Sequence, residues 1–596
     1  MVRATSSMIL LAAVVIACGS DKGGAPDSHL ADLRADSNRD GEVRFDDDSD
    51  ADKKSWNATT GAIFLANIDD DSQRCKSSTS DLTIALCNDA QDDVVNGDDD
   101  ARDIARLKTK PGPQPSDATG RVDIATAAAK DLVRLFKKVG SGPTDFEAIT
   151  GETVFSREEL EAGIELGIEA KDVVRDPEVW DGYVDVRLSV SSNERGASSD
   201  MVRMRVAPVL TYHHLLPAET VWISNTLTRA QLETHDDIKT SCTTAGLRAP
   251  KTLDVDDQWA QDYFEPAFMS MPGAGGAQHV MRVNYRSANI FNPKERETPL
   301  RPAGRIVFLL RGKDVAGIQQ FDLANSRIEM DTLNSFGNFE TVPPYEKDGV
   351  TYPLGRVLRG ATTSWHPDRA FATMVNAQAQ QPPIEIDTSW MFVGHVDETL
   401  SFVKAPSRRG WALLLNDPRL AKRMFEDAVA SGNGDTPMFL DRSWIDIQSG
   451  VTSAAEVTVS QVLKDREVMQ ASAEAAVEVD AQLEILKDAI GLTDDEIIPV
   501  PFLHTIHAGR SIAYQPGMVN GLYVADDRFA APDPHGPRIG GKDIFKAAFS
   551  ESLGKIGITV DWVENWDAYH RFFGEVHCGS NTTRAIPEAR WWESGR

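Results

Sequence analysis

Acidic side chains crowd the first sixth of this chain, and apolar runs interrupt them. Residues 19–105 hold 22 acidic and 9 basic side chains, a net charge of −13 within the −29 of the 596-residue chain. A charge run is typically a solvated surface, but this one contains Trp56 and the apolar runs 62–65 and 82–86, which predict strands. We therefore expect a folded acidic domain. The charge argues against nucleic acid as a partner, because phosphates would be repelled, and favours metal ions or basic substrates.

Part of this acidic segment has the pattern of a calcium-binding loop. Asp36, Asn38 and Asp40 place oxygen ligands at alternate positions, and Gly41 allows the sharp turn that follows. Position twelve of the pattern is Asp47 instead of a bidentate Glu, so the match to an EF-hand is incomplete. A second cluster follows a predicted strand and is expected to close the same site: Asn67, Asp69 and Asp71. The alternative interpretation is a solvated acidic surface.

The amino terminus has the pattern of an export signal. Residues 1–18 begin with a basic side chain and continue as a ten-residue apolar run, too short to span a bilayer. The run ends at Cys18 in a pattern that resembles a bacterial lipobox, which predicts a lipid anchor as the sole membrane attachment. An ordinary cleaved signal is the alternative, and residues 19–30 suit a tether. We predict an exported protein, either secreted or a cell-envelope lipoprotein. Export permits disulfides, so Cys75 and Cys87 either pair or stay free thiols.

The remaining chain divides into a strand-rich part and a mixed part. Residues 183–190 and 201–206 alternate apolar and polar side chains, as half-buried strands do, and predict a β-sandwich domain over 31–212. The second half shows strand-like runs and one segment without Gly or Pro that predicts a helix ending at Gly491, which together indicate an α/β class. The strand-like runs are 305–310, 390–393, 400–403 and 411–415, and the helical segment is 453–490.

Three short segments of the second half carry reactive side chains. They supply one thiol, one imidazole and two carboxylates: Cys578, His395, Asp262 and Asp397. This set suits attack of a thiolate on the carbon of a guanidinium, with the imidazole moving protons and the carboxylates gripping the cation. On a strand, His395 and Asp397 would point to the same face.

Zinc is the alternative use of these side chains, with His395, Asp397, His577 and Cys578 as ligands. His577 and Cys578 are adjacent, and on a strand they would point to opposite faces. A shared metal is therefore disfavoured.

The reactive segments belong to a longer series of motifs that resembles the protein-arginine deiminase family. The matching stretches are WAQD (259–262), NSFGNFE (334–340), TYPLGR (351–356), VGHVDE (393–398), PGMVN (516–520), FGEVHCGSN (573–581) and WW (591–592). The resemblance implies a multidomain protein. An immunoglobulin-like calcium-binding domain over 31–212 would precede a catalytic α/β domain of five-fold propeller (pentein) architecture over 216–596.

The resemblance also implies an activity. It is the hydrolysis of peptidyl-arginine, in an arginine-containing protein or peptide, to peptidyl-citrulline and ammonia. Cys578 matches the nucleophile that forms a covalent thiouronium, His395 the general acid and base, and Asp262 and Asp397 the carboxylates that hold the guanidinium. Two further residues match substrate contacts, Trp259 as a tunnel wall and Arg286 on the substrate backbone.

A family calcium site beside the catalytic Asp262 is implied as well. Its ligands would be side-chain oxygens of Gln261, Glu265 and Glu340 and backbone carbonyls of Phe336 and Phe339. Oxygen donors are what Ca²⁺ requires, and Gln261 adjoins Asp262, so the ion would order the active site.

This chain departs from the family pattern at several positions. Tyr263 and Val283 stand where acidic ligands of a second calcium are expected, so that ion is predicted to be absent or held differently. Ala288 and Phe572 stand where basic residues are expected. Two alternatives to the peptidyl-arginine activity stay open: deimination of free arginine or another small guanidino compound, and a catalytically silent calcium-binding surface protein.

Overall fold

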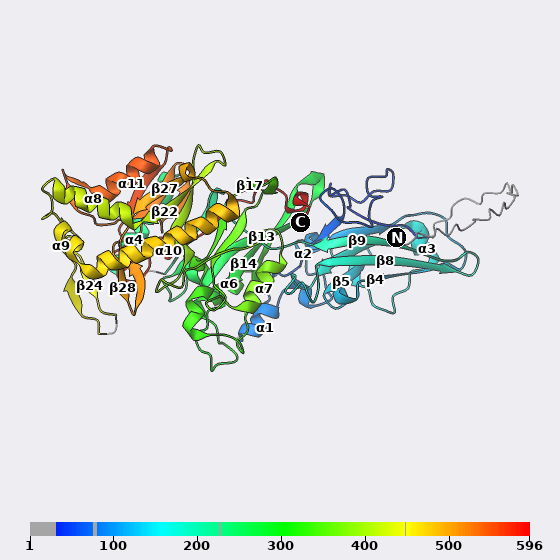
Figure 1. The fold of residues 1–596 in the computed structure, drawn as a ribbon. Helices are drawn as coiled ribbons and strands as arrows, with labels where there is room; N and C mark the ends of the chain where they lie inside the picture. Colours follow the sequence, from blue (N-terminus) through cyan, green and yellow to red (C-terminus); the bar gives the residue numbers. More distant parts are fainter. Residues whose placement is uncertain (1–30, 76–79, 226–227, 448) are drawn as a thin grey trace, which may run out of the picture.

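The computed structural model describes residues 31–75, 80–225, 228–447 and 449–596. The predicted signal, lipobox and tether fall in 1–30, outside the described residues. Figure 1 shows an elongated molecule with a β-rich part at one end and a larger mixed α/β part at the other. None of the helices described is long and apolar enough to cross a membrane.

The amino-terminal part consists of two sheets around one core. Val184, Val186 and Leu188 alternate with more exposed neighbours and are fully buried, as the sequence pattern predicted. They share a hydrophobic cluster with Leu107 and Leu166 of the other sheet, so the sheets form two layers. One sheet has the order β1-β3-β7-β5-β6 (Leu33–Ala35, Ala105–Thr109, Glu165–Ala170, Val133–Lys138, Phe146–Ala148). The other is β2-β9-β8-β4 (Ala62–Phe64, Gly196–Val206, Tyr183–Ser192, Thr119–Ile124).

The apolar run 82–86 is a helix and not the predicted strand. Helix α1 (Asp81–Leu86) begins where the Ser80 side chain accepts a hydrogen bond from the Thr83 backbone. Leu82 and Leu86 are exposed, whereas Ile84, with Ala85 beside it, packs into a cluster with catalytic-half residues. A disulfide joins Cys75 to Cys87 and closes the segment around the helix. A five-residue apolar run does not distinguish a helix from a strand. Here packing against the catalytic half favours the helix.

The second half contains five sheets with the same topology. In each, an antiparallel strand pair is followed by a helical connection and a third strand parallel to its neighbour. This repeated unit confirms the α/β class. Four units run in chain order. They are β13/β14/β15 (Phe264–Pro272, Gln278–Arg286, Val315–Ile318), β16/β19/β20 (Phe339–Val342, Arg356–Gly360, Ile384–Ile386), β21/β22/β27 (Leu400–Lys404, Trp411–Asp417, Ile497–Pro501) and β30/β31/β34 (Leu522–Ala525, Arg528–Pro532, Thr559–Val563).

The fifth unit is assembled from both ends of the catalytic half. Strand β35 (Ser580–Arg584), near the carboxy terminus, pairs antiparallel with β11 (Ala218–Ser224), and β11 pairs parallel with β12 (Lys251–Leu253) across helix α4 (Arg229–Thr244). The succession of units thereby closes on itself, which brings the segment before β35 to the same region as the chain following β12.

Two of the predicted strands have other structures. Residues 305–310 form mainly α6 (Ile306–Leu309), and residues 390–393 hold a turn and one isolated bridge from Met391 to Ser511. The runs 400–403 and 411–415 are strands β21 and β22, as predicted. The apolar composition of the four segments predicts that they are buried. It does not predict which of them pairs with a neighbouring strand.

The long segment 453–490 is divided. Helix α10 (Arg466–Ile490) ends at Gly491 in a left-handed conformation, as the sequence predicted. Before it lie short strands and α9 (Val459–Lys464), because Thr458 and Asp465 each cap the start of a new helix with their side chains.

Candidate active site

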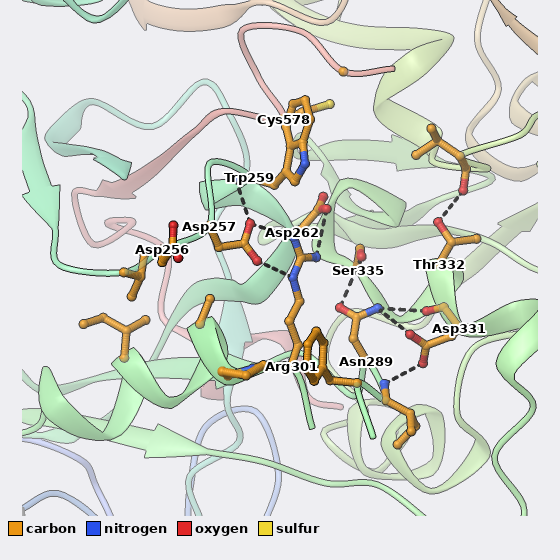
Figure 2. A pocket seen from close by; sticks show the side chains of 18 of the residues that line it. Asp256, Asp257, Trp259, Asp262, Asn289, Arg301, Asp331, Thr332, Ser335 and Cys578 are labelled. Atoms are coloured by element: carbon orange, nitrogen blue, oxygen red, sulfur yellow. Dashed lines mark hydrogen bonds and ion pairs between the residues drawn. The ribbon is translucent and has the colours of Figure 1, made fainter. Parts of the chain in front are cut away.

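The three reactive segments meet at one cavity of about 950 Å³ (Figure 2). Asp262 lines it from helix α5 (Ala260–Tyr263), and Trp259 lines it from the position just before that helix. His395 lines it from the residue before a 3₁₀ turn (Val396–Glu398), and Cys578 from the loop before β35. Gly574 permits this packing, because a Cβ there would lie 2.3 Å from the Trp259 ring.

The Cys578 thiol is buried between oxygen atoms. Its Sγ lies 3.7 Å from Asp397 Oδ2 and 3.4 Å from Asn520 Oδ1. Burial, followed by the charges of Asp397 and Asp262, raises the pKa of the thiol well above its ordinary value. In the free protein the group is therefore a neutral thiol. A cation placed between the two carboxylates would remove the main electrostatic penalty on the thiolate.

His395 is held as a base. Its Nε2 lies 2.9 Å from the Thr332 carbonyl oxygen, and because a carbonyl only accepts, Nε2 carries the proton and donates it. Its Nδ1 is then an acceptor, and in the described part of the chain no hydrogen-bond partner reaches it. The nearest carboxylate oxygen, Oδ1 of Asp262, is 3.9 Å away. Gly337 is required there, since a Cβ would lie 2.5 Å from Nδ1.

Asp397 connects the nucleophile to a neighbouring histidine. His577 Nδ1 donates to Asp397 Oδ2 at 2.8 Å, the same oxygen that faces Cys578. The expectation that His577 and Cys578 point to opposite faces is wrong, because residues 576–579 form a turn and not a strand. Asp397 likewise lies on a 3₁₀ turn, and His395 directly before it, instead of on the strand that the sequence suggested. The other Asp397 oxygen is buried and, among the described residues, has no hydrogen-bond donor.

Arg301 occupies a position that no sequence motif indicated. Its Nη1 donates to Asp262 Oδ2 at 3.0 Å, and its Nε and Nη2 donate to the two Asp257 oxygens at 2.7 and 2.8 Å. Figure 2 shows the guanidinium between the two carboxylates. Burial raises the pKa of Asp262, and the charges of Arg301 and His395 oppose that shift. Arg301 therefore binds the carboxylate that was expected to grip substrate.

Arg286 is not placed to contact a substrate in this structure. It is fully buried, its Nη1 pairs with Asp81 of α1 at 2.8 Å, and it donates to Gln319 and to the Arg301 carbonyl. The prediction of a substrate-binding Arg286 therefore needs correction: Asp81 supplies the negative charge that draws this guanidinium away from the cavity, and Arg286 supports the loop that carries Arg301.

The expected calcium ligands beside the active site converge, together with two histidines. The Gln261 amide donates to Glu265 Oε2 at 2.9 Å and to the Phe336 carbonyl at 3.2 Å.

Glu340 lies against two histidines. Its Oε2 is 2.7 Å from His214 Nε2, and its Oε1 is 3.6 Å from His577 Nε2. Burial and the charge of Glu340 raise the pKa of Glu265 well above its usual value. Phe339 directly precedes Glu340 on β16, and its ring packs on that of Phe336. His214 had no signal in the sequence beyond being a histidine.

The two acidic clusters of the amino-terminal part form separate groups. Asp36 accepts from the Gly41 amide at 2.9 Å, and Asn38 and Arg44 contact Asp40. Burial raises the pKa of Asp36 to about 6. The joint site expected from the sequence is therefore not formed, because the loop satisfies its carboxylates internally.

The second cluster gathers carboxylates from distant segments. Asp69, Asp71 and Asp89 offer oxygens within 4.8 Å of one another, and Asp103 with Asp314 of the catalytic half forms a neighbouring group that includes His279. Both oxygens of Asp69 and of Asp71 are buried without a hydrogen-bond donor in the described residues. Asn67 lies beside this cluster and donates to Asp100 and Glu169 instead.

Burial and mutual repulsion raise the pKa of Asp69 to about 10 and that of Asp71 to about 7. An arrangement of this kind fits a bound hard cation.

Comparison with known proteins identifies relatives of the whole chain. A family model described as protein-arginine deiminase matches residues 196–593. The type-4 protein-arginine deiminase of Rattus norvegicus is 28% identical over 89% of this chain and 78% of its own length, and that of Mus musculus is 27% identical over 94% and 82%.

Solved structures give weaker similarities. The agmatine deiminase of C. jejuni has a TM-score of 0.36 at 9% identity, covering 64% of this chain and 98% of that one. An amidinotransferase from Microseira wollei has a TM-score of 0.32 at 10% identity, covering 64% and 99%. The family match spans two thirds of the sequence and includes every reactive segment described above. The chain belongs to the protein-arginine deiminase family and is an enzyme that acts on guanidinium C–N bonds.

Proposed function

We propose that this enzyme hydrolyses peptidyl-arginine to peptidyl-citrulline and ammonia. The observation that carries the proposal is that Cys578, His395 and Asp262 line one cavity, with Asp397 Oδ2 3.7 Å from the Cys578 sulfur. Its walls include five carboxylates, which favour a cationic side chain over neutral citrulline: Asp254, Asp256, Asp257, Asp262 and Asp331.

The first half of the reaction uses the substrate's own charge. A guanidinium held by Asp262 and Asp397 offsets the repulsion that keeps Cys578 protonated, and the thiol proton passes to His395 Nδ1. The thiolate attacks the guanidinium carbon and forms a C–S bond. His395 returns the proton to the departing nitrogen, the C–N bond breaks, and ammonia leaves an S-alkylthiouronium on Cys578.

The second half uses the same base. His395 Nδ1 takes a proton from water, and the hydroxide adds to the thiouronium carbon. The C–S bond then breaks to give the thiolate and citrulline protonated on its ureido oxygen, and that oxygen's proton passes to solvent. The proton on His395 returns to Cys578. The Thr332 carbonyl holds Nε2–H throughout, so Nδ1 is the nitrogen that exchanges protons.

Apolar surface at the cavity supports a peptide as the substrate. Phe291 and Leu309 line it with 71% and 49% of their surface exposed, which is more than a small polar substrate would need. Deimination of free arginine is the competing function, and the experiment below separates the two.

Calcium is part of the proposal through the cluster of Asp69, Asp71, Asp89, Asp103 and Asp314. When bound, Ca²⁺ would supply positive charge to the oxygens of Asp69 and Asp71, for which the described residues provide no donor. These residues come from both halves of the molecule, so they would hold the amino-terminal part against strands β14 and β15.

Three structural and cellular inferences complete the proposal. The five equivalent units closed by β35 and β11 favour the pentein propeller. The two-layer amino-terminal part is consistent with an immunoglobulin-like domain, and the disulfide between Cys75 and Cys87 is typical of an exported protein. Export by way of residues 1–18, with Cys18 as a lipid anchor, stays a prediction.

The experiment compares a blocked arginine peptide with free arginine, in calcium or chelator, and measures citrulline. We expect citrulline from the peptide alone, and complete loss in Cys578→Ser. The matched control is Cys242→Ser, which alters the other buried free cysteine, remote from the cavity lining, and should keep its activity. Citrulline from free arginine alone would replace the proposed substrate, and no citrulline from either would favour a silent binding protein.

A further inference from the structure

Three side chains behind the nucleophile form a compact group of ligand atoms. His214 lies between β10 (Leu210–Thr211) and β11, Glu340 on β16, and His577 in the loop before β35. One ligand atom from each lies within 4.8 Å of the other two, and the imidazole centroids are 5.2 Å apart. Ligand atoms around a tetrahedral Zn²⁺ are separated by about 3.3 Å, so rotation of these side chains by a small amount completes the geometry.

The group borders a space of the size of one ion. A cavity of about 20 Å³ is lined by His214, His577, Glu265 and Gln261. That volume holds a single water molecule or metal ion. Glu340 does not line this cavity, but its Oε1 is buried 3.6 Å from His577 Nε2 and, within the described residues, no donor forms a hydrogen bond to it. Glu265 also lines this cavity; it lies outside the group of three, and its carboxylate would reach the ion only after its side chain rotates.

The charge of the surroundings favours a cation of charge two. Glu265 and Glu340 are buried together, and Arg584 is the basic side chain that faces both. Its guanidinium lines the same cavity and donates to the Leu216 and Tyr523 carbonyls. Two carboxylates against one guanidinium leave a negative charge for a metal to neutralise.

His577 also has the supporting contact that metal-bound histidines have. Its Nδ1 donates to Asp397 Oδ2 at 2.8 Å, so in the neutral ring Nε2, which lies 3.6 Å from Glu340 Oε1, is the nitrogen that can bind a metal. A histidine ligand almost always gives its second ring N–H to a carboxylate or carbonyl, which fixes the tautomer and strengthens the ligating nitrogen.

The donor atoms distinguish between metals. Ca²⁺ takes six to eight oxygen ligands, whereas imidazole nitrogen suits Zn²⁺, Co²⁺ and Ni²⁺. The side chains expected to hold calcium here, with the carbonyls of Phe336 and Phe339, are Gln261, Glu265 and Glu340, and two imidazoles join them. The Gln261 amide donates to Glu265 and to the Phe336 carbonyl, so two of the expected oxygen ligands are occupied by its N–H groups. This donor set fits calcium poorly.

We propose that His214, His577 and Glu340, with Glu265, form a binding site for a divalent transition metal of the zinc class behind the active-site cysteine. The ion would bond to His577, which is covalently adjacent to Cys578 and hydrogen-bonded to Asp397. Metal binding would therefore orient Asp397. That last consequence rests on the proposed function, whereas the metal site itself does not.

The test measures binding without relying on activity. The full chain, stripped with a chelator, is titrated with Co²⁺ and followed by visible absorption, then with Zn²⁺ and with Ca²⁺ by calorimetry. We expect one Zn²⁺ per chain, an intense Co²⁺ spectrum of low coordination number, and loss of at least about 100-fold in Zn²⁺ affinity in His214→Gln. His366→Gln, a histidine outside the group, is the matched control and should bind Zn²⁺ as the parent does.

Glu340→Gln is the second variant. It removes a different ligand of the same site, so the proposal can still be tested if His214→Gln does not fold. Thermal unfolding in chelator shows whether each variant is folded. A Co²⁺ spectrum or Zn²⁺ affinity that His214→Gln and Glu340→Gln leave unchanged overturns the proposal, as does Ca²⁺ that displaces Zn²⁺ at comparable concentration. Since binding is read directly, an enzyme inactive on every arginine substrate would contradict the proposed function and leave this result standing.

Discussion

Arg301 already holds the carboxylate that a substrate guanidinium would need. It donates to Asp262 Oδ2, and its other nitrogens are bound by Asp257. A substrate must therefore displace one hydrogen bond of Arg301 or share Asp262 with it. Because both cations bind the same carboxylate, Arg301 weakens substrate binding, while its charge opposes the burial that raises the pKa of Asp262.

Replacing Arg301 is expected to change KM and the pH profile together. In Arg301→Gln, we expect KM for a blocked arginine peptide to fall by about tenfold, equivalent to about 1.4 kcal/mol. The pKa of Asp262 is already raised by burial, and loss of the guanidinium raises it further, so activity should disappear at a higher pH on the acid side. Steady-state kinetics across pH measure both effects.

Arg305→Gln is the control for this prediction, since Arg305 lines the same cavity and pairs with Asp81. It should move neither KM nor the acid limb appreciably. An unchanged or higher KM in Arg301→Gln would show that Arg301 positions Asp262 and does not compete with substrate.

At the scale of elements, the short helix α1 fastens the amino-terminal part to the catalytic half. Asp81, its first residue, is fully buried and pairs with Arg286 at 2.8 Å and Arg305 at 2.6 Å. Figure 1 shows α1 beside the catalytic half, near α7 (Arg369–Ala377). The loop that carries Arg301 is thus supported from another domain.

We expect Asp81→Asn to destabilise the protein by about 3–5 kcal/mol, because it leaves the buried Arg286 guanidinium without a counter-ion. Urea unfolding followed by tryptophan fluorescence measures the change. Asp98→Asn, at an exposed neighbouring position, should change stability by less than about 0.5 kcal/mol. Equal stabilities of the two variants would mean that the Asp81 pair contributes little to the interface.

At the scale of the whole molecule, the acidic cluster between the two parts makes stability depend on pH and calcium. Asp69 and Asp71 have pKa values of about 10 and about 7 in the folded chain, both above the ordinary 3.8. Carboxyls with raised folded pKa values contribute stability below the unfolded pKa and lose it as pH rises through the folded pKa.

In chelator, we therefore expect Tm to fall as pH rises from about 4 through about 7 and on toward 10. Calcium should remove most of this fall, since the bound ion favours the ionised carboxylates, and its stabilising effect should grow with pH. Differential scanning calorimetry measures both. Asp69→Asn with Asp71→Asn should abolish the calcium effect, and a calcium shift of unchanged size in that variant would place the ion elsewhere.

The sequence by itself indicated the candidate catalytic side chains, a strand-rich first half and an α/β second half. Cys578, His395, Asp262 and Asp397 were identified from short motifs, because a reaction that needs a thiol, a base and two carboxylates restricts residue type at few positions. The strand over 183–190 and the helix end at Gly491 were likewise predicted. Alternating apolar residues indicate a strand with one buried face, and a Gly after a helical segment indicates a left-handed residue that ends the helix.

Only the tertiary structure decided which groups oppose one another. Arg301 lies on Asp262, Asp81 holds Arg286, and His214 meets His577 across more than 350 residues of chain. No local pattern encodes these pairs, because a charged or imidazole side chain takes its partner from whichever element the packing brings within a few ångströms. The same reason separates the two acidic clusters that the sequence joined: their residues are close along the chain, and the fold gives each its own neighbours.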